Sequence, residues 1–131
     1  MTSFADFIPT SYDYIDSILE LARISSSDVV YDIGSGDGRL LFAALEKGAG
    51  KAVGVELNLE LIFSAREAAR NKGLESKVNF LEADVMDVCL TDASVVLCYL
   101  GFKASEALKP KFEKELKPGT RVIMETFPIP G

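Results

Sequence analysis

The sequence predicts an α/β domain built as a three-layer sandwich with a mostly parallel sheet. Short apolar segments alternate along the chain with segments of helical periodicity. A glycine-rich turn directly follows the first apolar segment. The length of 131 residues fits one domain, so we expect residues 1–131 to fold as a single unit. Strands that alternate with helices are typically parallel and joined by right-handed crossovers.

Strands are expected where the sequence is wholly apolar over a few residues, because parallel strands are buried on both faces. Within a sheet core over 28–127, the expected strands are 29–33, 52–55, 78–81, 95–98 and 120–127. Only residues 83–92 connect the third strand to the fourth. This connection is short for a crossover helix, so we expect one helical turn or an irregular loop there.

An N-terminal helix is expected over 10–24, because Thr10 can cap it and apolar residues then recur at helical spacing. Further helices are expected at 39–47, 58–72 and 103–117. Gly48 and Gly73 end the first two of these, and Pro110 could break the third.

The chain contains no histidine, which excludes several kinds of site. A Ser-His-Asp triad, a Cys-His pair and a histidine-ligated metal cannot form within it, and we expect no metal. With 14 Lys and Arg against 20 Asp and Glu, the formal charge is −6. This balance argues against nucleic acid as a partner and is compatible with a basic protein partner.

The cysteines and the apolar runs indicate the compartment. Cys89 and Cys98 have neither a metal-site spacing nor that of a redox pair, so we interpret them as reduced. The N-terminal sequence has no signal-peptide pattern, and no apolar run approaches the roughly 20 residues of a membrane helix. We therefore expect a cytoplasmic protein with no membrane association.

The strongest local signal is the glycine-rich turn over 34–38, which follows the first expected strand. Glycines let the backbone turn sharply and approach a ligand, and the next helix offers unpaired N–H groups. A dinucleotide motif would require glycine where Arg39 stands. Asp32, inside the end of the strand, would repel a pyrophosphate but suits an ammonium group. A tight turn that binds no ligand is the alternative interpretation.

Two further acids follow the next two expected strands. Glu56 ends the second strand, where an acid can accept both hydroxyls of a ribose. Asp84 closely follows the third strand. Each acid alone could be a solvated loop carboxylate or a helix cap. Together with Asp32 and the glycine turn, they predict a ligand site at the carboxyl edge of the sheet.

This pattern resembles the class I S-adenosylmethionine-dependent methyltransferases, which have a Rossmann-like fold. The resemblance implies S-adenosyl-L-methionine as cofactor and S-adenosyl-L-homocysteine as product. It implies that the methionine end is held by Asp32, Gly34, Ser35, Gly36, Asp37 and Gly38. By the same resemblance, Glu56 binds the ribose and Leu57 lines the adenine. The adenine amino group is assigned to Asp84, with Val85 and Met86 beside the ring.

A narrower similarity covers residues 9–127. Segments 28–40, 52–58 and 108–116 resemble small archaeal protein-lysine methyltransferases and their mitochondrial relatives. The resemblance implies a lysine-containing protein substrate. The superfamily continues past the fifth strand, whereas this sequence stops at Gly131. The fifth strand would then be an apolar edge. We therefore expect either a truncated chain or a partner, such as a second copy in a homodimer, that covers this edge.

The resemblance places the catalytic region just after the fourth strand. There, Tyr99 and Phe102 could wall a channel for a lysine side chain, or they could be core aromatics. Tyr12 and Tyr14 could cover the cofactor in the same sense. Cys98 lacks the preceding proline of the cytosine C5 enzymes, so we expect a buried strand residue and not a nucleophile.

Several functions stay open at this point. The leading hypothesis is methyl transfer to protein lysine, which needs no histidine base because the cofactor's sulfonium is already activated. A small-molecule acceptor is the second, and a truncated cofactor-binding domain that is inactive alone is the third. A dinucleotide-binding protein is a distant fourth.

Overall fold

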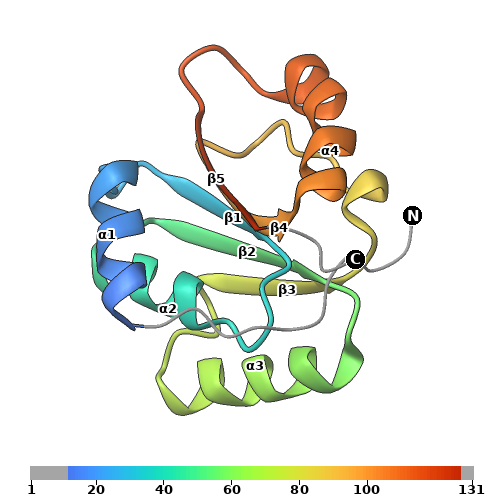
Figure 1. Ribbon diagram of the computed structural model, residues 1–131. Coiled ribbons are helices and arrows are strands. Elements are labelled where there is room, and N and C mark those ends of the chain that lie inside the picture. The colour runs from blue at the N-terminus through green and yellow to red at the C-terminus, as the bar shows by residue number, and fades with distance from the viewer. Residues whose placement is uncertain (1–11, 128–131) are drawn as a thin grey trace.

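The computed structural model describes residues 12–127 (Figure 1). Its helices are α1 (Tyr12–Ala22), α2 (Arg39–Glu46), α3 (Leu59–Asn71), the 3₁₀ turn η1 (Val85–Asp87) and α4 (Phe102–Glu115). Its strands are β1 (Val29–Ile33), β2 (Lys51–Glu56), β3 (Val78–Glu82), β4 (Val95–Gly101) and β5 (Arg121–Phe127). The predicted alternation of strands and helices is confirmed.

The five strands form one parallel sheet in the order β3-β2-β1-β4-β5. The chain therefore builds outward from β1 to one side through β2 and β3, and then to the other side through β4 and β5. Strand order reverses at β1, and Asp32 of β1 lies opposite Gly54 of β2 and Leu97 of β4. Open α/β sheets bind ligands beyond the carboxyl ends of the strands at such a reversal.

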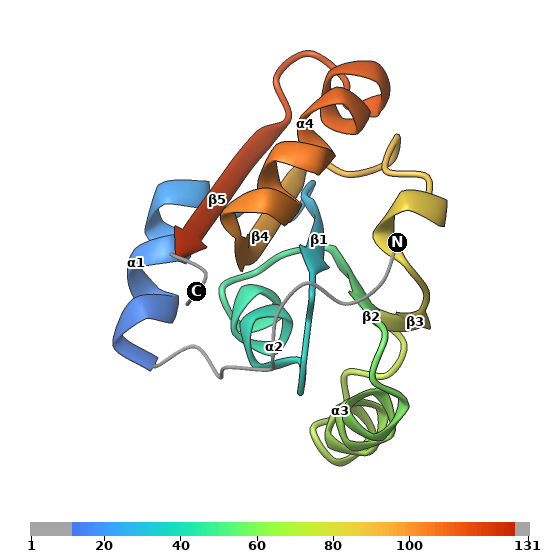
Figure 2. The same cartoon turned by 45° about the vertical axis from the view of Figure 1, so that its right-hand side comes forward.

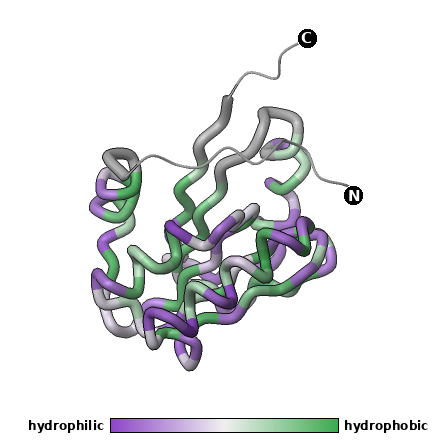
Figure 3. Tube along the Cα trace, turned by 90° about the horizontal axis from the view of Figure 1, so that it is seen from below, coloured by the Kyte–Doolittle hydropathy of each residue, from purple (hydrophilic) through white to green (hydrophobic). Residues whose placement is uncertain are grey.

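Helices cover the sheet on both faces, as Figures 1 and 2 show. Helices α1, α2 and α3 pack on one face, where alternate strand residues such as Val30 and Leu97 join their core. Helix α4 and the segment around η1 cover the other face, where Ile33 and Val96 point. Along the helices, hydrophobic and hydrophilic stretches alternate, as expected for helices with one buried side (Figure 3).

The structure refines several predicted boundaries. The N-terminal helix begins at Tyr12, and its expected cap Thr10 lies outside the described residues. Strand β4 continues to Gly101, beyond the expected end at Cys98. The short connection before β4 contains only the single turn η1, as expected.

Helix α4 continues through Pro110 without a break. Proline cannot donate to the carbonyl of Glu106, four residues earlier, which normally interrupts a helix. Here Pro110 and Glu106 are both exposed, so water can satisfy that carbonyl. Sequence reasoning about the proline alone could not show on which side of the helix it lies.

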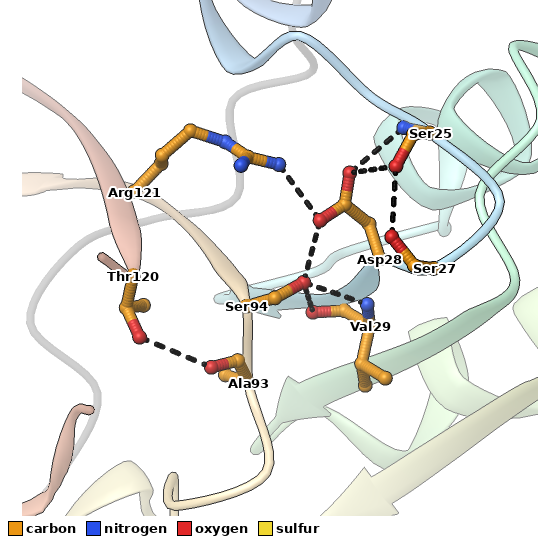
Figure 4. A network of polar contacts seen from close by, with 8 residues as sticks. All are labelled: Ser25, Ser27, Asp28, Val29, Ala93, Ser94, Thr120 and Arg121. Atoms are coloured by element: carbon orange, nitrogen blue, oxygen red, sulfur yellow. Dashed lines mark hydrogen bonds and ion pairs between the residues drawn. The ribbon is translucent and has the colours of Figure 1, made fainter. Parts of the chain in front are cut away.

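A buried polar network ties three strands together at the edge opposite the carboxyl ends (Figure 4). Asp28, 4% exposed, accepts hydrogen bonds from the Ser94 hydroxyl at 2.8 Å and from the backbone N–H of Ser25 at 2.7 Å. Arg121 completes the network with an ion pair of 2.7 Å to the same carboxylate. Burial alone would raise the pKa of Asp28, but these hydrogen bonds and the Arg121 charge lower it.

Asp28→Ala is expected to lower the free energy of unfolding by about 2–4 kcal/mol, because it removes the acceptor shared by Ser94 and Arg121. Chemical denaturation measures the effect, and Glu67→Ala on the exposed side of α3 is the control. The pKa of Asp28 is lowered on folding, so its contribution is present above the usual value of 3.8 and is lost as the pH falls through the folded pKa. Equal stability of the two variants would contradict this role for the network.

Candidate functional site

The glycine-rich turn between β1 and α2 is shaped by three residues with positive φ. Gly34, Gly36 and Gly38 have φ of 80°, 57° and 87°, a region that L side chains rarely adopt. The turn is anchored on β2, because the N–H groups of Gly34 and Ser35 both donate to the Val55 carbonyl, at 2.8 and 3.2 Å. The backbone thus folds back over the ends of β1 and β2.

Close packing beneath the turn adds a second requirement for glycine. A Cβ atom added to Gly54 of β2 would lie 2.7 Å from the Ser35 Oγ and 2.7 Å from the Phe80 ring. One added to Gly38, which caps α2, would lie 2.9 Å from the same ring. Gly54 was not among the predicted site residues; its signal is a glycine inside a strand, which often marks a close backbone approach.

Gly54→Ala is expected to destabilise the fold by about 1–3 kcal/mol, because the new methyl group overlaps Ser35 and Phe80. It should also weaken ligand binding by displacing the turn. Thermal unfolding and ligand titration measure the two effects. Glu67→Ala on the exposed side of α3 is the control for stability. Gly73→Ala is the control for ligand binding, because a Cβ there meets nothing within 4 Å, although its φ of 71° makes the substitution strained. A stability equal to that of Glu67→Ala, or a ligand affinity equal to that of Gly73→Ala, would contradict a packing role for Gly54.

Ser35 does not present its hydroxyl to the open edge. It is 5% exposed, and its Oγ lies against Gly54 with no hydrogen-bond partner among the described residues. A role of Ser35 in holding the methionine end would therefore fall to its backbone, and it stays a prediction.

Glu56 connects the end of β2 to the glycine turn. Its Oε1 accepts from the Gly36 N–H at 2.9 Å. Its Oε2 accepts from the N–H groups of Leu57 and Asn58, each at 2.9 Å. A carboxylate offers about four acceptor positions, so Oε1 keeps capacity for a ribose hydroxyl. Glu56 is therefore both a structural anchor of the turn and a candidate ligand contact.

Asp32 is a buried acid beneath the turn, 3% exposed. Burial raises its pKa to about 8, and the negative charges of Glu56 and Asp37 act in the same direction. Ionising this buried carboxyl costs free energy, and a cationic ligand beside it would offset that cost. This supports the prediction that an ammonium group binds here.

Asp37, in contrast, is already neutralised. The Arg39 side chain donates to both of its carboxylate oxygens, with Nη2 2.7 Å from Oδ2 and Nε 3.1 Å from Oδ1. Burial acts to raise the pKa of Asp37, but these hydrogen bonds and the Arg39 charge lower it. Asp37 therefore braces the start of α2.

The residues predicted to face an adenine lie after β2 and β3. Asp84 caps η1 by accepting from the Met86 N–H at 2.9 Å. Leu57 and Met86 are each 40% exposed, which leaves their side chains available to a ligand. Val85 is 7% exposed and packs into the core beneath α4. Its predicted place beside the ring therefore stays a prediction for its backbone.

The predicted substrate residues lie at the carboxyl end of β4. Tyr99 is within β4, and Phe102 is the first residue of α4. Their side chains lie outside the described part of the structure, as do those of Tyr12 and Tyr14. Cys98 is 3% exposed, and burial raises its pKa to about 12. The expectation of a buried strand residue there is confirmed.

Among the side chains that the structure describes, no group of three or more Cys, Asp or Glu is arranged to hold a metal ion. Over residues 12–127, every helix is too short or too polar to cross a bilayer.

The sequence profile of the ANTKMT methyltransferase domain matches residues 32–131. That match begins at Asp32 and includes the glycine turn and all four later strands. The chain belongs to this methyltransferase family. A protein-lysine N-methyltransferase of Saccharolobus islandicus is 40% identical over 126 residues, which are 95% of this chain and 78% of that protein.

Two further similar proteins are named for different methyl acceptors, a protein and RNA. The adenine nucleotide translocase lysine N-methyltransferase of Mus musculus is 34% identical over 95% of this chain, which spans 54% of its length. A solved structure of an RNA methyltransferase from Salinibacter ruber, in complex with S-adenosyl-L-homocysteine, is 35% identical with a TM-score of 0.87. The alignment covers 89% of this chain and 76% of that one.

S-adenosyl-L-methionine is accordingly the cofactor of this methyltransferase domain. The site fits that ligand in three respects. Asp32 is a buried acid suited to the ammonium group, and Glu56 retains acceptor capacity toward the ribose. The positive-φ glycines fold the turn back over the ends of β1 and β2, where its backbone can approach a bound methionine group closely.

Proposed function

We propose that this methyltransferase domain methylates lysine side chains of a protein. The observation that carries the proposal is the protein-lysine N-methyltransferase that is 40% identical over nearly the whole chain. The formal charge of −6 suits a lysine-rich segment better than a nucleic acid. The chain spans only about half the length of the mouse relative, so its competence for the whole reaction is part of the proposal.

The chemistry suits a chain without histidine. Bound S-adenosyl-L-methionine supplies an activated methyl group on a sulfonium. A lysine amine must lose a proton before it can attack, which costs roughly 4–5 kcal/mol at neutral pH for a pKa near 10.4. An apolar channel lowers that pKa by disfavouring the ammonium form, so proton release to water suffices.

Within the proposal, this chain positions the two reactants. The glycine turn and Asp32 orient the methionine end, and Glu56 holds the ribose. The carboxyl ends of β1 and β4 are neighbours in the sheet. Tyr99 and Phe102, at the end of β4, therefore stand beside the edge to which the amine must come, and we assign them the walls of the channel.

The RNA methyltransferase from Salinibacter ruber favours a second candidate function, methyl transfer to RNA. One experiment separates the two. The 131-residue chain is incubated with methyl-labelled S-adenosyl-L-methionine and an extract of the source organism, and the products are treated with ribonuclease or protease. Lysine methylation predicts label that resists ribonuclease and elutes as methyl-lysine after acid hydrolysis. Label lost to ribonuclease, or found on small molecules, would reject it.

Two finer points stay proposals. Strand β5 is an edge of the sheet, so a homodimer could cover it, which sedimentation at several concentrations would test. A cytoplasmic location stays a prediction that cell fractionation would test.

A further inference from the structure

One ion pair of α4 reaches out of its helix to the loop that follows β3. The Lys111 Nζ lies 2.6 Å from the Glu115 Oε2 and donates to the Met86 carbonyl at 3.3 Å. The other oxygen of Glu115, Oε1, accepts from the Leu90 N–H at 2.9 Å. The pair therefore holds the backbone of the 86–90 segment at both of its ends.

This pair is largely withdrawn from water. The Lys111 side chain is 9% exposed and that of Glu115 is 22% exposed. The Lys111 ammonium and the Leu90 N–H lower the pKa of Glu115. Ion pairs that are buried in this way and make further hydrogen bonds fix the positions of the groups they contact more firmly than exposed pairs do.

Apolar packing also holds the segment after β3 against α4. Val85 and Leu90 belong to the core cluster that Leu108 and Phe112 of α4 complete. The turn η1 has only three residues, which is too little regular structure to fix its own position. Helix α4, together with the face of the sheet, therefore fixes the path of the chain from Asp84 to Leu90.

A second ion pair of α4 provides the contrast. Lys109 and Glu106 are 2.7 Å apart, but their side chains are 55% and 48% exposed, and both residues belong to α4 itself. Exposed ion pairs of this kind contribute little to the stability of a protein. Two lysines two positions apart on one helix thus have different surroundings.

We infer that Lys111 and Glu115 are positioning residues that place the Asp84–Met86 segment and thereby set the preference of the site for adenine. The inference rests on the proposed role of that segment at the adenine. Neither side chain needs to touch the cofactor, since Lys111 acts through the Met86 carbonyl and Glu115 through the Leu90 N–H.

The test compares two ligands that differ at the base. S-adenosyl-L-homocysteine carries the adenine amino group, and S-inosyl-L-homocysteine has an oxygen in its place. Calorimetry gives the affinity of each for the wild-type chain, Lys111→Met, Glu115→Gln and the control Lys109→Met. Thermal unfolding of each variant shows whether it is folded.

The wild-type chain is expected to prefer the adenosyl ligand by about tenfold or more. Lys111→Met should lose about tenfold in affinity for that ligand and much of the preference, while Lys109→Met keeps both. Glu115→Gln retains an acceptor for the Leu90 N–H, so it should show a smaller loss of affinity. This variant supplies the test if Lys111→Met does not fold.

An unchanged preference in the folded Lys111 and Glu115 variants would overturn the inference. So would an equal loss for both ligands, which indicates general destabilisation. If the wild-type chain binds neither ligand, the cofactor site itself is wrongly assigned, which is a different result.

Discussion

Glu56→Ala is expected to reduce the affinity for S-adenosyl-L-homocysteine by about 100-fold or more. Two effects combine, because the carboxylate accepts from Gly36, Leu57 and Asn58 and is also the proposed ribose acceptor. Hydrogen bonds to charged groups contribute roughly 1.5–3 kcal/mol each, so the loss of two accounts for this factor. Isothermal titration calorimetry measures the change.

The structure supplies a matched control for Glu56. Glu82 ends β3 opposite Glu56 in the sheet register and is exposed, so Glu82→Ala removes a neighbouring acid of the same kind. We expect it to bind nearly as the wild type does. Glu56→Gln keeps one acceptor oxygen and should lie between the two alanine variants. Equal affinities for Glu56→Ala and Glu82→Ala would refute the ribose assignment.

Asp32→Asn is expected to stabilise the ligand-free chain while it abolishes cofactor binding. The pKa of Asp32 is about 8 in the folded protein and its usual value is 3.8. Between these values the unfolded chain has released a proton that the folded chain still holds. The free energy of unfolding therefore falls as the pH rises from about 4 to about 8. Asparagine removes that dependence, and we expect a gain on the order of a few kcal/mol at neutral pH.

Cofactor binding should depend on pH in the opposite direction. An ammonium group binds the ionised carboxyl, so affinity should rise as the pH increases toward about 8. Thermal unfolding and calorimetry between about pH 6 and about pH 8 measure both trends. Asp92→Asn, at an exposed acid in the connection before β4, is the control. A variant at Asp32 that is less stable than the wild type, or that binds equally well, would contradict this account.

The sequence predicted those parts of the site whose chemistry is local. Three glycines near one strand end indicate positive φ, and Glu56 and Asp84 follow strands whose apolar pattern is short and clear. The alternation of strands and helices then places these ends at one edge of a parallel sheet. Both inferences need only neighbouring residues and general topology.

The remaining features depend on contacts between distant segments. Gly54 matters because Ser35 and Phe80 approach it, and Lys111 matters because α4 passes beside Met86. A glycine inside a strand indicates that something approaches closely, but the sequence does not show which residues approach Gly54 or that Lys111 lies beside Met86. The inward position of Val85 also could not be predicted, because a single 3₁₀ turn is too short to show a periodicity.

The crystal structure of the chain with S-adenosyl-L-homocysteine tests the central claim most directly. The account predicts the ribose hydroxyls at Glu56, the amino group at Asp32 under the glycine turn, and the adenine between Leu57 and Met86. A nucleoside bound away from the carboxyl ends of β1 and β2, or an amino group that does not meet Asp32, would contradict it.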